Sequence, residues 1–433
     1  MAVEANLRGD EPAEMTKVAK EDEWIVNLDL AGFGREMREL GDKLRQQQGV
    51  ADEVHLDKIL RWHYAFCIAG FLTMYWQPNL FTVVCLSTGL YSRWVMIGHH
   101  VCHGGYDNTP AKKRGFSRWV FGVGSLLRRA IDWFDWMLPE AWNIEHGRFH
   151  HYSLNEDMDP DLVQMNAQWI RGLEIPVIFK YLTAAFFAIT WKWTYYSSNT
   201  YSQLLFTNKL KEMNSLSDQM KELAENKAAK ANLLDEFKKR HVMTVFHMID
   251  GNYPSWWSTS AYMQKVFLPF FFYRFVLSPL PFLLLGKTAF FNAVINLILA
   301  DMLCNCHSFL TVVPNHAGDD LYWFDDHCEP KSDEFFLRQV IGSTDCSAGT
   351  DPIDFFHGFL NYQIEHHLWP DLSMLSYQKA HPLVKDICKK YNVPFVQHTA
   401  FYRLHKTLEI FVGSKDMKLF PSHLLKRTPA RAK

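Results

Sequence analysis

The sequence has little of what marks several common protein classes. Its 433 residues include only 22 glycines and 18 prolines, which excludes a collagen-like chain and a generally disordered one. Its 45 Lys and Arg nearly balance its 47 Asp and Glu, for a formal net charge of -2. No charge excess therefore indicates a nucleic-acid partner. The eight cysteines form no CxxC pair, and Cys304 with Cys306 comes nearest, so a thiolate metal site or a redox motif is not expected.

An apolar leader is also missing. The first residues, MAVEANLRGDEPAEM, are acidic and contain no apolar run, which argues against a signal or transit peptide. Any membrane insertion must therefore use internal segments. Residues 1–60 are expected to form a polar cytosolic arm with an amphipathic helix over Leu30–Gln47 and no core of its own.

Apolar residues are concentrated in two internal blocks that the mean hydropathy of -0.16 hides. The first block, Trp62–Ile97, is interrupted at Gln77-Pro78-Asn79, and the second runs from Val266 to Val313 with a break at Gly286-Lys287. Each half approaches the roughly 17–25 residues that a membrane-spanning helix requires. The blocks predict two transmembrane hairpins, and buried hairpins of a soluble protein are the alternative.

Two further segments are helical candidates of a different kind. Ile175–Trp193 is apolar but contains Lys180 and Lys192, and it is expected to lie in the membrane plane or to be re-entrant. If it spanned the membrane, the histidine-rich segments described below would be divided between the two faces. Asn208–Arg240 is rich in Lys and Glu and predicts one amphipathic, solvated or membrane-surface helix. Its apolar stripe consists of Leu210, Met213, Leu216, Met220 and Leu223.

These patterns predict three regions. The arm at 1–60 is followed by a membrane domain over 61–395, which includes the amphipathic insert at about 200–260. A C-terminal segment, 396–433, ends in the basic tail KRTPARAK, which is expected to be disordered or to contact anionic lipid.

The most informative feature is the distribution of the 20 histidines. Several of them fall in three tight groups, and histidines four residues apart on a helix project from one face, where they can bind one metal. Imidazole-rich sites favour iron, copper, zinc or nickel. At least seven histidines exceed what one tetrahedral zinc can use, so two metals are implied. The grouped candidates are His99 and His103, then His146, His150 and His151, and then His366 and His367.

The segments around these histidines resemble a known family. GHHVCHGGYD, EHGRFHHYSLNEDMDPDL and NYQIEHHLWPDL are similar, in order and spacing, to the three histidine boxes of the integral-membrane fatty-acid desaturases, over about residues 60 to 395. The resemblance implies two irons that activate dioxygen to introduce a double bond into an acyl chain. With the apolar blocks, it predicts a mainly α integral-membrane protein with two transmembrane hairpins, about four spans, capped by a cytosolic helical domain that holds the di-iron site.

The resemblance also implies roles for single residues. His316, in VPNHAGD, corresponds to a ligand that the family places after its fourth span. Gln363 stands where many members have histidine, as in the acyl-lipid and front-end desaturases. His100 replaces a common Asp and is a possible additional ligand. His307, within an apolar run, is another, although a buried, hydrogen-bonded histidine is the simpler expectation.

The chemistry implied by the resemblance requires partners. The substrate would be an acyl-lipid or an acyl-CoA, with dioxygen as oxidant. The sequence contains no His-Pro-Gly-Gly haem motif, so a separate cytochrome b5 or ferredoxin would supply electrons. The expected location is the endoplasmic reticulum membrane with the boxes cytosolic, and a plastid or bacterial inner membrane remains an alternative.

Other interpretations stay open at this point. A hydroxylase, epoxidase or acetylenase of the same superfamily would share the ligand set. A membrane metal transporter and a soluble zinc enzyme are hypotheses of other classes. Trp133, Trp136 and Trp142 are expected to be anchors at the lipid headgroups, with the lining of an acyl tunnel as the alternative. Several polar residues near the boxes could orient metal-bound imidazoles or cap helices, namely Asp107, Asn155, Asp157, Asp159 and Asp371.

Overall fold

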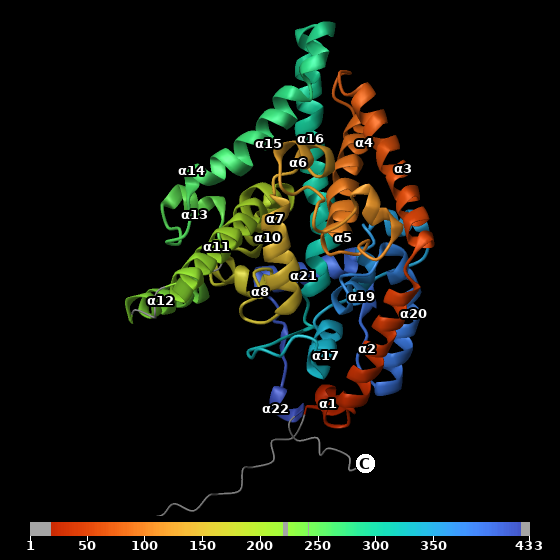
Figure 1. Cartoon of the computed structure of the whole chain (residues 1–433), viewed down its shortest axis with the longest axis vertical. Coiled ribbons are helices and arrows are strands. Elements are labelled where there is room, and N and C mark those ends of the chain that lie inside the picture. Colours follow the sequence, from red (N-terminus) through yellow and green to blue (C-terminus); the bar gives the residue numbers. More distant parts are fainter. Residues whose placement is uncertain (1–18, 220–223, 241, 426–433) are drawn as a thin grey trace, which may run out of the picture.

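The fold is mainly helical, and a computed structural model describes residues 19–219, 224–240 and 242–425. Two helical hairpins stand above a layer of shorter helices, the cap (Figure 1). The first hairpin consists of α3 (Val50–Thr73) and α4 (Leu80–Tyr91), which continues through a π-helical segment into α5 (His99–Cys102). The second consists of α14 (Thr259–Tyr262) and α15 (Leu268–Phe272), which form one long apolar segment, and α16 (Lys287–Val312).

The turns of both hairpins follow from local chemistry. The Asn79 side chain accepts a hydrogen bond from the backbone N–H of Thr82 (3.0 Å) and so caps the start of α4. In the second hairpin, the Pro279 and Pro281 region forms a 3-10 helix (Leu280–Leu285). Gly286 then reverses the chain with φ of 107°, a conformation that favours glycine. The breaks predicted at both turns are therefore confirmed.

Three helical segments are long and apolar enough to cross a membrane: Leu80–Cys102, Thr259–Leu285 and Lys287–His316. They support a membrane protein. The partner of the first segment, α3, carries charged residues in its first turns. The turns of both hairpins lie at the same end of the molecule, at the top of Figure 1, and the cap lies at the other end.

The cap and its extensions are built from many short helices and a few two-residue strands. β1 (Tyr322–Trp323) pairs with β4 (Lys418–Leu419), and β2 (Asp345–Cys346) pairs with β3 (Gln397–His398), both in parallel. The remaining helices are α1 (Glu23–Val26), α2 (Leu30–Gln47), α6 (Leu126–Asp132), α7 (Pro139–Ile144), α8 (Val163–Asn166), α9 (Gln168–Arg171), α10 (Val177–Trp191), α11 (Ser197–Gln219), α12 (Ala224–Arg240), α13 (Val245–Asp250), α17 (Asp333–Ile341), α18 (Asp351–Phe356), α19 (Gln363–Leu368), α20 (Met374–Tyr391), α21 (Ala400–Val412) and α22 (Ser422–Leu425).

The N-terminal and C-terminal regions are both part of the cap. α2 has the predicted bounds, and its buried Phe33 and Met37 join the main core as it packs against α17 and α20. α3 crosses the boundary expected at residue 60. The C-terminal segment contributes α21, whose Arg403 pairs with Asp320 (2.7 Å). The basic tail KRTPARAK lies outside the described residues.

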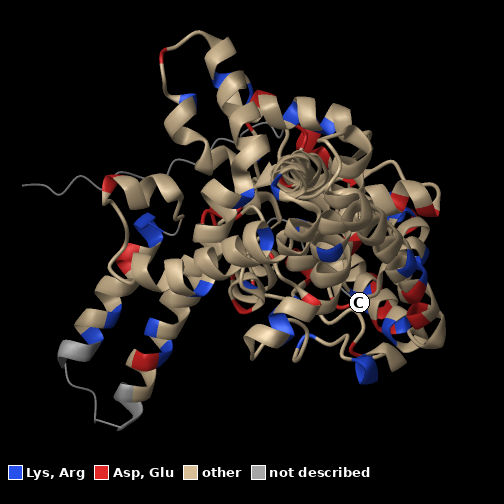
Figure 2. Cartoon of the chain, turned by 90° about the horizontal axis from the view of Figure 1, so that it is seen from above, with Lys and Arg blue, Asp and Glu red and all other residues tan. Residues whose placement is uncertain are grey.

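The amphipathic insert differs from its prediction, because it forms two helices rather than one. α11 and α12 pack against each other, with the rings of Phe206 and Phe237 stacked at 3.8 Å. Met213 is buried in the same cluster, so apolar residues of the insert face a partner helix. The pair projects from the body at the lower left of Figure 2 and carries charges of both signs. The side chains of Leu216, Met220 and Leu223 lie outside the described residues.

The three tryptophans expected at the lipid headgroups are instead buried. Trp133, Trp136 and Trp142 are at most 5% exposed, so the anchor interpretation was wrong. Trp142 stacks on His146 with 4.5 Å between ring centroids. Trp142 therefore packs directly against the histidine groups, and Trp133 packs behind it with 5.5 Å between ring centroids.

Candidate metal centre

The eight histidines predicted as ligands come together in the cap, although they are up to 268 positions apart in the sequence. They form two adjoining groups, and in each group the potential ligand atoms lie within 4.8 Å of one another. All eight are at most 6% exposed. The first group is His99, His103, His146, His151 and His366, and the second is His150, His316 and His367.

Local helix geometry places each box. His99 lies in α5 and His103 directly follows it, so one turn separates their side chains. His146 and His150 lie in a π-helical turn (Glu145–His150) rather than in a regular α-helix. Such turns are rare and often occur at functional sites. Here His146 is in the first group and His150 in the second, with a ring-centroid distance of 5.2 Å.

The nitrogen positions in the first group fit a shared metal. The Nε2 atom of His99 lies 3.0 Å from that of His366 and 3.1 Å from that of His146, and the His146 and His151 Nε2 atoms are 3.3 Å apart. Ligand nitrogens at roughly 2.1 Å from one metal are separated by roughly 3.0 to 3.4 Å for octahedral to tetrahedral angles. The donor set and its spacing therefore fit a histidine-bound transition metal.

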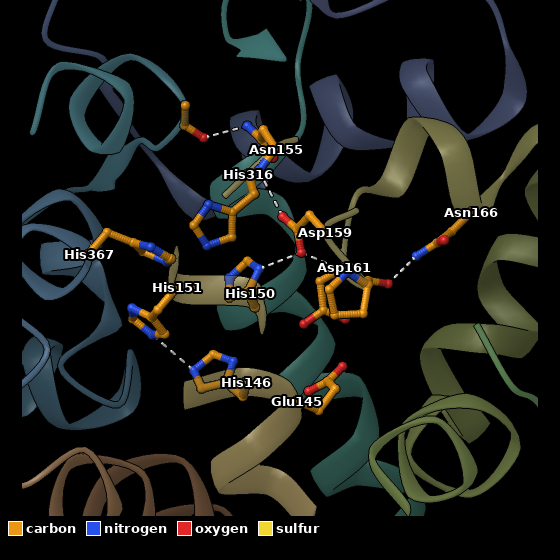
Figure 3. A network of polar contacts seen from close by, with 12 residues as sticks. Glu145, His146, His150, His151, Asn155, Asp159, Asp161, Asn166, His316 and His367 are labelled. Carbon is orange, nitrogen blue, oxygen red and sulfur yellow. Dashed lines mark hydrogen bonds and ion pairs between the residues drawn. The ribbon is translucent and has the colours of Figure 1, made fainter. Parts of the chain in front are cut away.

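The ring nitrogens that face away from the groups have polar neighbours. His150 Nδ1 lies 2.9 Å from Asp159 Oδ1 (Figure 3). His366 Nδ1 lies 3.2 Å from the Tyr377 hydroxyl, and His367 Nδ1 lies 3.2 Å from Gln339 Oε1. Hydrogen bonds of this kind set the tautomer and hold the ring, which leaves Nε2 free for a metal.

Burial keeps most of these imidazoles neutral. Removal from water, together with the neighbouring histidines, holds the pKa values of His146, His151, His366 and His367 well below the usual range. A neutral imidazole is the form that binds metals. For His150, burial opposes protonation, but the Asp159 carboxylate outweighs it and raises the pKa.

The three possible additional ligands have different positions. His100 is absent from both groups, and its Nδ1 lies 2.7 Å from the Met96 carbonyl oxygen. His307 is also absent from both groups, with Nε2 2.7 Å from the Phe356 carbonyl oxygen, as expected of a hydrogen-bonded histidine. Gln363 is buried, and its Nε2 lies 2.8 Å from His316 Nε2. Gln363 therefore contacts a histidine of the second group through a polar atom, whereas the His100 ring packs on His99 of the first group with 5.2 Å between centroids.

Only some of the residues that hold the histidine rings in place were predictable from the sequence. Of the polar residues near the boxes, Asp159 contacts a histidine of the groups, whereas Asp107 pairs with Arg118 and Asp371 with Arg45. Gln339 and Tyr377 were missed, because single Gln and Tyr residues on α17 and α20 carry no local signal. Also missed were Glu145 and Asp161, which lie on the side of the His146 and His150 rings away from His151 and His367 (Figure 3).

Burial also affects the pKa values of these two carboxyl groups. Removal from water raises the pKa of Asp161 to about 6 and that of Glu145 well above its usual range. The side chain of Asn199 donates a hydrogen bond to Glu145 (3.0 Å). Glu145, Asp161 and Asn199 together make the outer side of the π-helical turn polar.

Two cavities reach the histidines. An apolar cavity of about 510 Å³ contacts His99, His146, His150 and His316. A second, more polar cavity of about 760 Å³ contacts His103, His151 and His367, and α2 contributes side chains to its wall. Each cavity thus reaches members of both groups.

A family model and several curated proteins are similar in sequence to this chain. A family model described as fatty acid desaturase matches residues 74–399, more than half of the chain. A Delta(8)-fatty-acid desaturase of Helianthus annuus is 36% identical over 93 residues, which cover 22% of this chain and 19% of that protein. An acyl-lipid (9-3)-desaturase of Borago officinalis is 40% identical over 81 residues, covering 19% and 17%.

A more distant relative gives a longer match. The Delta(5) fatty acid desaturase A of Dictyostelium discoideum is 26% identical over 133 residues, covering 30% of this chain and 27% of that protein. The matched segments of the first two relatives span about a fifth of their length. No solved structure matches the chain significantly. On the strength of the match over residues 74–399, the chain belongs to the fatty acid desaturase family.

Proposed function

We propose that this protein is an oxygen-dependent fatty-acyl desaturase that introduces a double bond at a histidine-ligated di-iron centre. The observation that carries the proposal is the convergence of eight buried histidines in two adjoining groups with Nε2 separations of 3.0 to 3.3 Å in the first. Two groups suit two metals, and imidazole suits iron.

The ligands in this proposal are the eight predicted histidines. His99, His103, His146, His151 and His366 would hold one iron, and His150, His316 and His367 the other. When bound, iron supplies the activation of dioxygen. The protein holds most of the imidazoles neutral, orients three of them through Asp159, Gln339 and Tyr377, and keeps the acyl chain in a cavity with mainly apolar walls.

The overall reaction determines which partners are needed. Conversion of –CH2–CH2– to –CH=CH– removes two hydrogens, and with one dioxygen, two electrons and two protons it yields two waters. The electrons require a separate donor, a cytochrome b5 or a ferredoxin. The acyl group would be carried on a lipid or on CoA, and Gln363 in the third box supports the acyl-lipid and front-end type.

The proposed membrane arrangement has two hairpins and four spans, with α3 as the fourth. The histidine groups lie at the cap ends of the candidate spans Leu80–Cys102 and Lys287–His316, and the cap would face the cytosol at the endoplasmic reticulum. Metal ligands at the ends of spans, packed into a buried cap, do not form a path across the membrane, which disfavours a metal transporter.

Expression in yeast tests the proposal through fatty-acid profiles read by gas chromatography. The expected result is a new unsaturated fatty acid that depends on oxygen and disappears in His146→Ala. The purified protein should contain about two irons per chain. A hydroxylated product with no new double bond would contradict the desaturase proposal and favour a hydroxylase of the same family.

A further inference from the structure

The described wall of the apolar cavity contains no permanently charged cation. Among the described residues, its lining contains no Lys or Arg. The titratable side chains in it are histidines of the two groups, Asp161, His247, Tyr195 and Tyr196. The rest of the wall is formed mainly by aliphatic and aromatic side chains. The cavity can therefore hold an acyl chain, but it offers no cation to a phosphate group.

The outer end of this cavity is marked by three lining side chains that are also exposed. They are Trp169 on α9, Phe186 on α10 and Phe246 on α13, with exposed fractions of 53%, 47% and 41%. We call this end the aromatic mouth. α13, which carries Phe246, lies at the left side of the molecule below the hairpin turns (Figure 1), so the aromatic mouth faces sideways.

A collar of exposed apolar residues adjoins the aromatic mouth. Soluble surfaces rarely expose so many large apolar side chains together. α10 continues through the π-helical segment Lys192–Tyr196 into α11, and among the described residues this continuous helix is not one of the candidate membrane spans. It therefore suits a position along the bilayer surface, with its outer face in lipid. The collar consists of Leu173, Ile175, Val177, Ile178, Phe179, Leu182, Ile249 and Tyr253.

Two cations near the start of α10 are committed to other partners. The Lys180 ammonium, itself buried, donates to the carbonyl oxygens of Arg171 (2.8 Å) and Val412 (3.4 Å). The Arg171 guanidinium pairs with Asp416 (2.5 Å). Neither faces an incoming ligand. At the aromatic mouth, a CoA thioester, which carries several phosphates, would therefore find neither of these cations available for its headgroup.

We propose that the apolar cavity is loaded sideways from the bilayer through the aromatic mouth, and that its substrate is the acyl chain of an intact membrane lipid. The inference rests on the proposed function for what happens at the metal centre, but loading itself requires no chemistry. The exposed collar places the aromatic mouth in the lipid, and the mainly apolar wall, which has no Lys or Arg among its described residues, accepts the chain while the headgroup stays at the membrane surface.

Photolabelling of the full-length protein in phosphatidylcholine nanodiscs tests the inference. One probe is a phosphatidylcholine with a diazirine on one acyl chain, and the other is the CoA thioester of the same diazirine acid. The lipid probe should label peptides that line the cavity, and excess CoA thioester should not compete. Labelling of the cavity by the CoA probe, or by the free diazirine acid, in place of the lipid probe would overturn the inference.

Two variants of α10 provide a matched pair. Phe186→Lys puts a charge in the aromatic mouth, whereas Leu182→Lys puts the same charge one turn earlier, at a residue that is 57% exposed and does not line the cavity. Phe186→Lys should lower cavity labelling by about tenfold or more, because a charge in the lipid path is costly. Equal labelling in both variants would contradict entry at this mouth.

The same nanodiscs separate this inference from the proposed function. With iron and reductant added, isotope-labelled acyl chains in phosphatidylcholine should gain a double bond before any CoA pool does. If the lipid probe labels the cavity but no substrate is oxidised, the desaturase proposal fails and lateral loading stands. If only acyl-CoA is desaturated, lateral loading fails and the desaturase proposal stands.

Discussion

At the scale of single residues, the metal centre depends on side chains that hold the histidines as well as on the histidines themselves. Asp159 is the clearest example. Its Oδ1 accepts from His150 Nδ1 and from the Asp161 backbone N–H (both 2.9 Å), and its Oδ2 accepts from the Asn155 backbone N–H (2.8 Å). One carboxylate therefore links the second box to the loop that follows it.

Replacement of Asp159 should weaken metal binding without unfolding the protein. In Asp159→Asn, an amide NH2 replaces one of the two acceptor oxygens. All three neighbours of this side chain are N–H donors, so one of the three hydrogen bonds is replaced by a contact between two donors. Loss of such a support for a ligand typically lowers metal affinity by about 10- to 100-fold. Competition with a chelator measures this affinity. Asp157→Asn, at an exposed position two residues earlier, is the control and should match the unmodified protein.

Two neighbouring histidines of the first box should behave differently. His103 belongs to the first group, whereas His100 belongs to neither and makes a local hydrogen bond to Met96. His103→Ala should lower the iron content. His100→Ala should retain iron but lower the free energy of unfolding by about 2–4 kcal/mol, because removal of the buried imidazole leaves a cavity in the core. Iron analysis and thermal unfolding test the pair, and iron loss in His100→Ala would show that His100 is a ligand.

The sequence predicted the grouping of these residues better than their local geometry. Four-residue spacing on a helix was sufficient to pair His99 with His103. His146 and His150 lie instead in a π-helical turn, which spacing alone does not reveal. Gln339 and Tyr377 support the site from α17 and α20, and only tertiary packing brings them there.

At the scale of helices, α2 shows how the cap closes over the centre. Its residues Arg38 and Arg45 line the polar cavity, and Arg38 pairs with Asp333 of α17. The helix approaches α17 closely at Gly34, where a Cβ atom would lie 2.7 Å from the Asp333 Cα. The amphipathic pattern predicted this helix, but not the surface it covers.

Gly34→Ala tests that close approach. Alanine favours a helix over glycine by about 1 kcal/mol, so an isolated α2 would gain stability. In the folded protein the added Cβ meets backbone, and overpacking of this kind costs about 1–3 kcal/mol. The melting temperature should therefore fall. Gly49→Ala is the control, because a Cβ there meets nothing within 4 Å. An increase in the Gly34→Ala melting temperature would contradict tight docking.

The insert shows where helix-level prediction failed. A single stripe over Asn208–Arg240 fits one helix, yet two helices use apolar residues to pack on each other, with Phe206 against Phe237. The periodic spacing of apolar residues indicates which side chains are shielded from water, but it does not indicate which element packs over them.

At the scale of the whole molecule, the arrangement of hairpins and cap was largely predictable, since apolar blocks and their breaks are local properties. The turns at Gln77–Asn79 and Gly286 lie where the sequence placed them. The C-terminal segment was not recognised as part of the cap, because α21 and strands β3 and β4 join it only through contacts with distant residues. Long-range packing of this kind has no signature in a local window of sequence.

The topology of the molecule makes a final prediction about its membrane orientation. If α10 does not cross the bilayer, both hairpin turns face the lumen, whereas a crossing α10 would put them on opposite sides. The sequence contains no Asn-x-Ser/Thr acceptor for N-glycosylation, so any glycan found on the protein must be attached to an inserted acceptor site. Acceptors on flexible inserts after Pro78 and after Gly286 should both be glycosylated in yeast, seen as a mass shift removed by a glycosidase. The same insert after Glu329 of the cap should stay unmodified. Glycosylation of only one turn would show that a segment between the hairpins spans the membrane, and it would separate the first histidine box from the third.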